Sequence, residues 1–398
     1  MQHRLSRVAL AALATASSAA LASSALAQSV SDNIQVHGYL TQGFGASDSL
    51  PILGITNKGS ADYRAAAVQV RAALTSKDVA VVQLANRRMG ESSTNNLDNA
   101  VSVQWAYYQR RLGGGLSAKL GRAPMPKGIF NEVRKVGTVL PFYRAPYNFY
   151  TESYETVDGA ILSHSLSLGS WALESNAFGG VADFRQSGSS TVYKPTFAAT
   201  PNGPVMTGVT PLKDSAYTVK ERVQQTAGAQ FWLSTPIDGL RVGVGATRFK
   251  LNAYQELSGR NGPSVASTIQ GAVDGSFTRF QLRSEWEQFR VDDFMYTSAY
   301  VQGGVKLTER LSLVAEHDVT NLNVSARPNI LGIPAELTPR TAQHEKFATD
   351  NAIGASWAFR PGVVLKSEAH RHLGSDYDRP VTGTPKSVYF ISSLALAF

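Results

Sequence analysis

Apolar and polar side chains alternate along this chain over segments of about ten residues. In one such segment Val101, Val103 and Trp105 share one face, and Ser102 and Gln104 share the other. A period of two predicts β-strands, because successive side chains of a strand point to opposite faces. After residue 28 the sequence contains no clear helical period and no apolar run of roughly 18 residues, so no membrane-spanning helix is expected.

Residues 1–27 have the features of a secretory signal peptide. They carry Arg4 and Arg7, continue with a small-residue apolar stretch, and end in an A-x-A sequence at 25–27. We therefore expect a mature chain of residues 28–398. Removal of the two arginines lowers the formal net charge from +8 to +6, without any Lys/Arg block that would suggest nucleic-acid binding.

The connections between the alternating segments follow a rhythm typical of a transmembrane β-barrel. Tight turns such as "TSKD", "LGGG", "PIDG" and "FRPG" alternate with long polar loops, as periplasmic turns alternate with extracellular loops in barrels. The long loops are expected at 47–62, 124–157, 181–221, 252–274 and 321–345. A soluble sandwich would also alternate, but here the polar face carries large charged groups on many strands.

Counting strands under this rule predicts sixteen, an even number that places both ends of the chain on the periplasmic side. The segment 289–296 alternates least well because of its "VDD" sequence. The strands are expected to begin near Ile34, Ala65, Val79, Ala100, Leu116, Asp158, Trp171, Arg222, Leu240, Phe277, Phe289, Tyr300, Leu311, Phe347, Val363 and Ser387.

The final segment, "SVYFISSLALAF", predicts the strand that closes the barrel by pairing with the first one. We expect Val388, Phe390, Leu394, Leu396 and Phe398 to face lipid and Tyr389, Ile391, Ser393, Ala395 and Ala397 to face inward. A terminal aromatic residue also resembles the C-terminal signature by which bacterial outer-membrane proteins are recognised for assembly.

The loop most suited to a function is the segment 121–159, directly after the fifth expected strand. It is rich in aromatic and apolar residues and is stiffened by four prolines at 124, 126, 141 and 146. A sixteen-strand barrel is too wide for side chains to fill its interior. The inside wall of the barrel is therefore available for this loop to pack against.

Three segments, "KLGRAPMPKGIF", "NEVRKVG" and "YETVDGAILSHSL", resemble the Gram-negative outer-membrane trimeric porin family. The similarity is nearest to its specific and phosphate-selective-like porin branch. It implies an all-β barrel with an inward-folded constriction loop after strand 5, passive diffusion of small hydrophilic solutes, a homotrimer, and neither cofactor nor catalysis. It also implies the outer-membrane bilayer, its lipopolysaccharide and the assembly machinery as partners.

Carrying the family's constriction roles onto this loop assigns charged residues to the narrow part of the pore. The constriction would contain Lys127, Glu132, Arg134, Lys135, Arg144, Glu152 and Glu155. The pore wall opposite would contain Arg71, Arg87, Arg110, Lys119, Arg279 and Arg283. Rings of Lys and Arg favour anions, so we expect a modest anion preference.

Two alternatives compete with an open channel. One is an adhesin or structural barrel without an open pore. The other is an outer-membrane hydrolase, suggested by His164 between Ser163 and Ser165, although neighbouring strand residues point to opposite faces. His370 and His372 face one way and could hold a metal, but a third ligand is not evident, so no metal site is expected.

Overall fold

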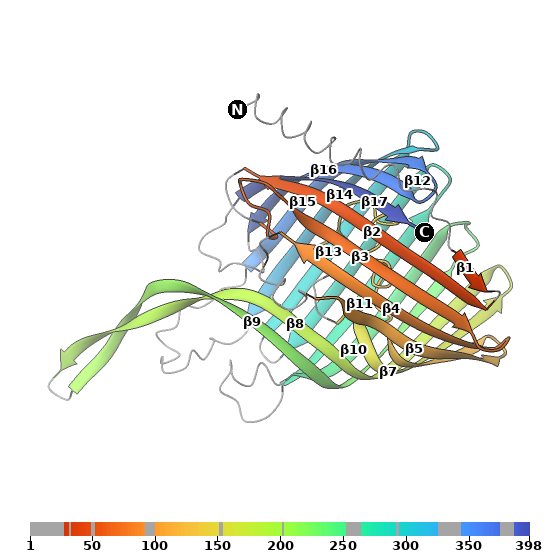
Figure 1. Ribbon diagram of the computed structural model, residues 1–398. Coiled ribbons are helices and arrows are strands. Elements are labelled where there is room, and N and C mark those ends of the chain that lie inside the picture. Colours follow the sequence, from red (N-terminus) through yellow and green to blue (C-terminus); the bar gives the residue numbers. More distant parts are fainter. Residues whose placement is uncertain are drawn as a thin grey trace.

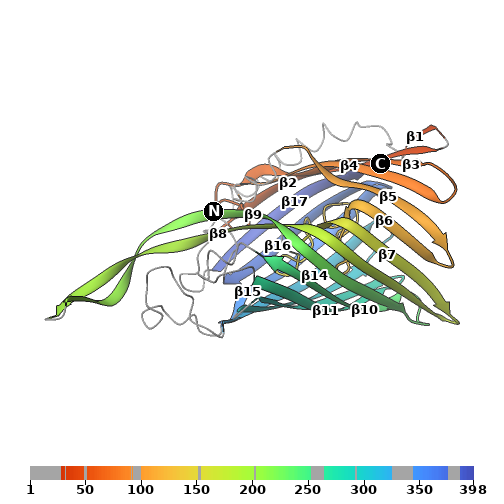
Figure 2. The same ribbon diagram turned by 90° about the horizontal axis from the view of Figure 1, so that it is seen from below.

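The computed structural model describes residues 28–31, 33–48, 52–90, 92, 100–150, 154–200, 203–251, 264–291, 294–324, 344–374 and 386–398. The expected signal peptide, residues 1–27, lies outside this part of the chain. The described strands wind into a barrel, with one hairpin that extends far beyond its rim (Figures 1 and 2). Within the described residues no helix is long and apolar enough to cross a membrane.

The barrel consists of sixteen antiparallel strands, β2 to β17, preceded by a short strand β1. The first half contains β1 (Gln28–Ser31), β2 (Ile34–Ser47), β3 (Ser60–Ala73), β4 (Asp78–Met89), β5 (Ser102–Gly113), β6 (Leu116–Pro124), β7 (Thr156–Leu168), β8 (Trp171–Thr200) and β9 (Gly203–Ser234). The second half contains β10 (Leu240–Leu251), β11 (Ser264–Ser276), β12 (Phe280–Val291), β13 (Phe294–Lys306), β14 (Leu311–Val324), β15 (His344–Arg360), β16 (Val363–Gly374) and β17 (Lys386–Ala397).

The last strand closes the barrel onto the first. In the antiparallel pair of β17 and β2, Ile391 lies opposite Gly45 and Leu396 lies opposite Leu40. Each of the sixteen strands thus has two hydrogen-bonded neighbours, and the predicted closed barrel is confirmed.

The two faces of the final strand follow the predicted alternation. Val388 and Phe390 are 51% and 42% exposed, whereas Tyr389 and Ile391 are 3% and 2% exposed. The same alternation runs through β12, where Leu282 and Trp286 are exposed and the charged Arg283 and Glu285 lie on the opposite face. The barrel therefore has an apolar outer face and a polar inner face, which is the reverse of a soluble protein.

The predicted number of strands is correct, but two of the assignments behind it are wrong. Strand β11 (Ser264–Ser276) lies inside the segment that we expected to be a loop at 252–274. Conversely, Phe289 lies near the end of β12, and Tyr300 lies within β13, so no separate strand begins at Phe289. Small residues in β11, including Gly271 and Gly275, hide its alternation, and the two errors cancel in the count.

The loop expected at 181–221 is also wrong. Strands β8 and β9 continue through this segment as a hairpin, paired from Ala172↔Ser234 to Thr200↔Gly203. This hairpin forms the long projection in Figure 1. Its polar composition suggested a loop because, beyond the barrel rim, a strand needs no apolar face.

Candidate functional site

The segment 125–155, which joins β6 to β7, contacts the polar face of β12. The backbone N–H of Ile129 donates to Glu285 Oε1 at 2.9 Å, and Tyr150 OH donates to the same carboxylate. Lys127 Nζ forms an ion pair with Glu287 Oε2 at 2.9 Å. Burial and the adjacent carboxylate raise the pKa of Tyr150 well above its usual value, so its hydroxyl stays a donor.

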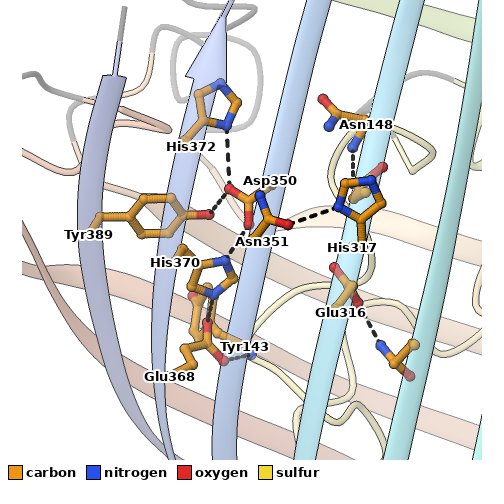
Figure 3. A network of polar contacts seen from close by, with 12 residues as sticks. Tyr143, Asn148, Glu316, His317, Asp350, Asn351, Glu368, His370, His372 and Tyr389 are labelled. Atoms are coloured by element: carbon orange, nitrogen blue, oxygen red, sulfur yellow. Dashed lines mark hydrogen bonds and ion pairs between the residues drawn. The ribbon is translucent and has the colours of Figure 1, made fainter. Parts of the chain in front are cut away.

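The same segment is fastened to β14 and β16 by further backbone hydrogen bonds. The N–H of Asn148 donates to Asp318 Oδ2 at 2.8 Å, and the N–H of Tyr143 donates to Glu368 Oε2 at 2.7 Å (Figure 3). Lys366 Nζ donates to the carbonyl of Phe142 at 2.8 Å. Three acids of the wall, Glu285, Asp318 and Glu368, and the amine of Lys366 thus bind the loop backbone. Hydrogen bonds with a charged partner are stronger than hydrogen bonds between neutral groups.

Aromatic side chains of the loop fill the space beside these hydrogen bonds. The Phe130 and Tyr150 rings meet edge to face at 5.8 Å, and Phe149 meets Tyr300 of β13 at 5.8 Å. Phe130 and Phe149 are each 1% exposed. Burial of such a ring contributes on the order of 2 kcal/mol, so packing and charged hydrogen bonds hold the loop together.

The base of the loop is closed by an ion-pair cluster around Glu155. Its carboxylate pairs with Arg134 and, at 2.6 Å, with Lys135 Nζ. Asn131 Nδ2 adds hydrogen bonds to the carbonyls of Met125 at 2.7 Å and Glu155 at 3.0 Å. Burial alone would raise the pKa of Glu155, but the charges of Arg134 and Lys135 outweigh it and hold this pKa well below its usual range.

Behind the loop, β15 to β17 carry a buried network centred on Asp350 (Figure 3). His370 Nδ1 lies 2.7 Å from Asp350 Oδ1, His372 Nδ1 lies 3.3 Å from Oδ2, and Tyr389 OH donates to Oδ2 at 3.0 Å. His370 Nε2 also lies 3.3 Å from Glu368 Oε1, next to the loop. Among the described residues no group of three or more His, Cys, Asp or Glu side chains is arranged to hold a metal ion.

Basic side chains occupy the part of the wall that lies opposite β12. In a ring of sixteen strands, β4 and β12 are eight strands apart and therefore face each other across the barrel. Arg71 on β3 and Arg87 on β4 lie on the inner face with the buried Val81 and Gln83, and Lys119 on β6 lies beside the buried Ile161 of β7. A cavity beside this wall is lined by Arg87, Gln104, Arg122, Lys135, Glu155 and Asp183, among others.

Several solved structures share this architecture. OmpF of Salmonella typhi, in complex with daunomycin, has 10% identity and a TM-score of 0.60, covering 94% of this chain and 100% of that one. The channel DcaP of Acinetobacter baumannii has 9% identity and a TM-score of 0.58 over 94% and 100%. An anion-selective porin from Comamonas acidovorans has 10% identity and a TM-score of 0.50 over 92% and 99%.

The chain has the porin fold. No protein-family model matches the sequence, and no similar protein was found among curated proteins. At identities near 10% the likeness concerns the fold alone. The assignment to a phosphate-selective branch therefore stays a prediction.

The structure brings three of the seven predicted constriction residues into contact with one another. Arg134, Lys135 and Glu155 form the cluster at the base of the loop. Glu132 lies 3.9 Å from Lys119 Nζ, and the Arg144 guanidinium lies 4.5 Å from the centre of the Tyr147 ring. Glu152 lies outside the described residues.

Two predicted wall residues lie elsewhere. Arg110 is on the outer face, because a β-bulge between Gln83 and Leu84 shifts the register of β5 by one residue. It pairs across the strands with Asp78, two residues from the exposed Leu112. Arg279 lies in the short turn before β12 and is exposed to solvent. The other four wall residues, Arg71, Arg87, Lys119 and Arg283, lie on the inner face.

The wall residues that bind the loop were missed by the sequence analysis. Glu285, Asp318 and Glu368 each lie on the polar face of an alternating strand, so their inward direction was readable. Their partners are separated from them by 135 to 225 residues. Only the folded barrel brings such distant positions together.

The histidine that suggested a hydrolase does not meet its neighbouring serine. His164 alternates with Leu162 and Leu166, which are 46% and 41% exposed on the outer face. Ser163 points inward and hydrogen-bonds to Asn176 at 2.6 Å. The two side chains lie on opposite sides of the wall.

Proposed function

We propose that this protein is an outer-membrane channel for the passive diffusion of small hydrophilic solutes. The apolar outer face suits a lipid bilayer, and a barrel of sixteen strands is wide enough to enclose an aqueous lumen. The Acinetobacter protein DcaP, which has the same fold, is an outer-membrane channel, which supports this location.

The observation that carries the proposal is the position of the segment 125–155. It leaves the wall at β6, reaches inner-face groups on β12, β14 and β16, and returns to the wall at β7. A segment on this course crosses the lumen and narrows it. We therefore propose that it is the constriction loop and that Lys127, Glu132, Arg134, Lys135, Arg144, Glu152 and Glu155 belong to it.

The distribution of charge supports a modest anion preference. Glu285, Asp318 and Glu368 are 2%, 0% and 3% exposed, and each binds the loop backbone. Arg71, Arg87 and Lys119 on the opposite wall are only partly buried. A permeating ion therefore meets more positive than negative charge, and a narrow pore with low-dielectric walls magnifies such a difference.

The outer face also supports a homotrimer. Val68, Val70, Val82 and Leu84 of β3 and β4 are 41–48% exposed and form a smooth apolar surface, whereas large exposed aromatic residues lie on β9, β12 and β15. A second copy would pack on the smooth surface. Light scattering in mild detergent should give three times the mass of the mature chain, and a monomeric mass would contradict the trimer.

The function is tested by recording purified protein in a planar bilayer. We expect stepwise conductance without an energy source and a reversal potential of the sign for anions in a salt gradient. A barrel without an open pore, the adhesin alternative, would insert without conducting.

A further inference from the structure

The segment 52–57, in the long connection between β2 and β3, folds into the barrel and is buried there. Its apolar side chains Ile52, Leu53 and Ile55 are 4%, 3% and 0% exposed. Ile55 packs on β2, since a Cβ atom added to Gly45 would lie 3.2 Å from the Ile55 side chain. The segment therefore covers part of the barrel wall near the rim that carries the long loops.

The wall beneath this segment is apolar, in contrast to the polar inner face of β12, β14 and β16. Buried inward positions on neighbouring strands are occupied by Tyr389 and Ile391 of β17, Tyr63 of β3 and Met89 of β4. On β2 between them, Gly45 lies opposite Ile391 and shares its inward direction. Apolar surface gains free energy by leaving water, so this patch favours a segment that covers it.

Specific contacts fix the segment to the ends of β3 and β4. The hydroxyl of Tyr63 donates to the carbonyl of Leu53, and Gly90 leaves room for the carbonyl of Gly54, which any side chain at Gly90 would meet. Leu53 has a φ of 52°, in the left-handed region that favours glycine. A leucine keeps such a conformation only where the surrounding structure imposes it. The segment is thus a built part of the wall.

The segment lies next to the proposed constriction loop, on the side of the long-loop rim. Tyr143 of the loop packs edge to face on Tyr63, with ring centres 5.6 Å apart. The same tyrosine lies over Gly43 of β2, where a Cβ atom would be 3.1 Å from its ring. Ile55 lies over Gly45, two residues nearer the rim. The two inward segments are therefore stacked along β2.

We propose that residues 52–57 form a second restriction of the pore, which limits the size of the solutes that pass and does not select their charge. The inference rests on the proposed channel function. The segment occupies room on the lumen side of four strands, beside the constriction loop. Its sequence, "ILGITN", contains no ionisable side chain. Size and charge selection are thus assigned to different segments.

The position of the segment is tested with single cysteines in the full-length mature protein, because the chain contains none of its own. The thiol of Ile55→Cys should react with a water-soluble maleimide at least about tenfold more slowly than that of Asn57→Cys, since a buried thiol reacts only after local opening. Asn57 is exposed and only two residues away, so it is the matched control. Equal rates for the two thiols would overturn the proposal.

The effect on passage is measured by the swelling of liposomes that contain the purified protein, in neutral mono-, di- and trisaccharides. Leu53→Ser/Ile55→Ser removes the apolar anchors of the segment. We expect faster entry of the larger sugars, a higher single-channel conductance and an unchanged reversal potential in a salt gradient. The control is Ile237→Ser/Leu307→Ser, which changes two exposed apolar residues in short turns and should match the wild type in all three.

The outcomes separate this inference from the proposed function. Equal sugar entry and conductance in Leu53→Ser/Ile55→Ser and wild type would overturn the second restriction. A shifted reversal potential with unchanged sugar entry would also overturn it. A wild type that does not conduct would instead contradict the proposed channel. Tyr63→Phe, which removes only the hydroxyl that binds Leu53, repeats the test if the serine variant does not fold.

Discussion

Phe398, the last residue of the chain, exchanges two backbone hydrogen bonds with Gly38 near the start of the barrel. Gly38 N donates to Phe398 O at 2.8 Å, and Phe398 N donates to Gly38 O at 2.9 Å. The Phe398 ring lies where a side chain on Gly38 would be. The seam of the barrel is therefore closed by an aromatic residue that fits only over glycine.

Replacement of Gly38 by valine should weaken this seam. The added side chain would collide with the Phe398 ring and the β3 backbone, and overpacking of this kind costs about 1–3 kcal/mol. Urea unfolding in detergent should show the loss as a lower midpoint. Gly303→Val is the matched control, because a side chain at this strand position meets open space. Equal midpoints for the two variants would mean that the contact between Phe398 and Gly38 does not stabilise the seam.

Glu155→Gln should destabilise the base of the loop at neutral pH by about 3–5 kcal/mol, because it leaves the buried Arg134 and Lys135 without their anion. In the wild type the pKa of Glu155 is lowered. Its contribution to stability is thus fully present above the pKa of the unfolded chain, about 4.3. It is lost as the pH falls through the lower, folded-state pKa.

The unfolding free energies of wild type and Glu155→Gln should therefore converge below about pH 4. Measurement of both proteins from pH 7 downward checks this trend. A difference that stays constant with pH would show that the carboxylate charge plays no part.

Glu368→Ala/Asp318→Ala should loosen the loop where it meets β14 and β16. These two carboxylates accept the N–H groups of Tyr143 and Asn148. Hydrogen exchange at these two amides should become faster by at least about tenfold, as expected for the loss of a charged hydrogen bond. Glu174→Ala removes an acid on β8, far from the loop, and should leave both amides protected. Unchanged protection in the double variant would refute the proposed attachment.

Much of the fold was predictable because alternation is a local property. The faces of β17 follow from side-chain period alone, and a long loop at about 124–157 follows from the rhythm of the turns. The β-bulge that turns Arg110 outward is not local, since it depends on how β5 pairs with β4. Strand β11 was hidden for a related reason. Small residues such as Gly271 do not show which face of the strand they occupy until they are paired with Val244 and Trp286 on the neighbouring strands.

For the site, the charges on the loop were visible in the sequence but their partners were not. Arg134 and Lys135 lie within a short distance of Glu155 along the chain, so their proximity was accessible. The acids that bind the loop, Glu285 and Glu368, are distant from it in sequence, and only the folded barrel places them beside it.

Arg134→Ala/Arg144→Ala should weaken the anion preference and widen the conducting path. Each of the two substitutions removes a positive charge from the proposed constriction loop, and Arg134 also supports the base of that loop through its ion pair with Glu155. Single-channel recordings should show a larger conductance and a reversal potential closer to zero. Lys306→Ala, in which the removed cation lies at the end of β13 next to a short turn, serves as the control. An unchanged conductance would show that the loop does not line the narrowest part.

The most direct test of the central claim is the zero-current potential of wild-type protein in a planar bilayer under a tenfold potassium chloride gradient. We expect stepwise channel openings and a modest potential of the sign for chloride permeation, because partly exposed Arg71, Arg87 and Lys119 face a wall whose acids bind the loop. Insertion without conductance would contradict the channel. A potential of the sign for potassium permeation would contradict the proposed distribution of charge.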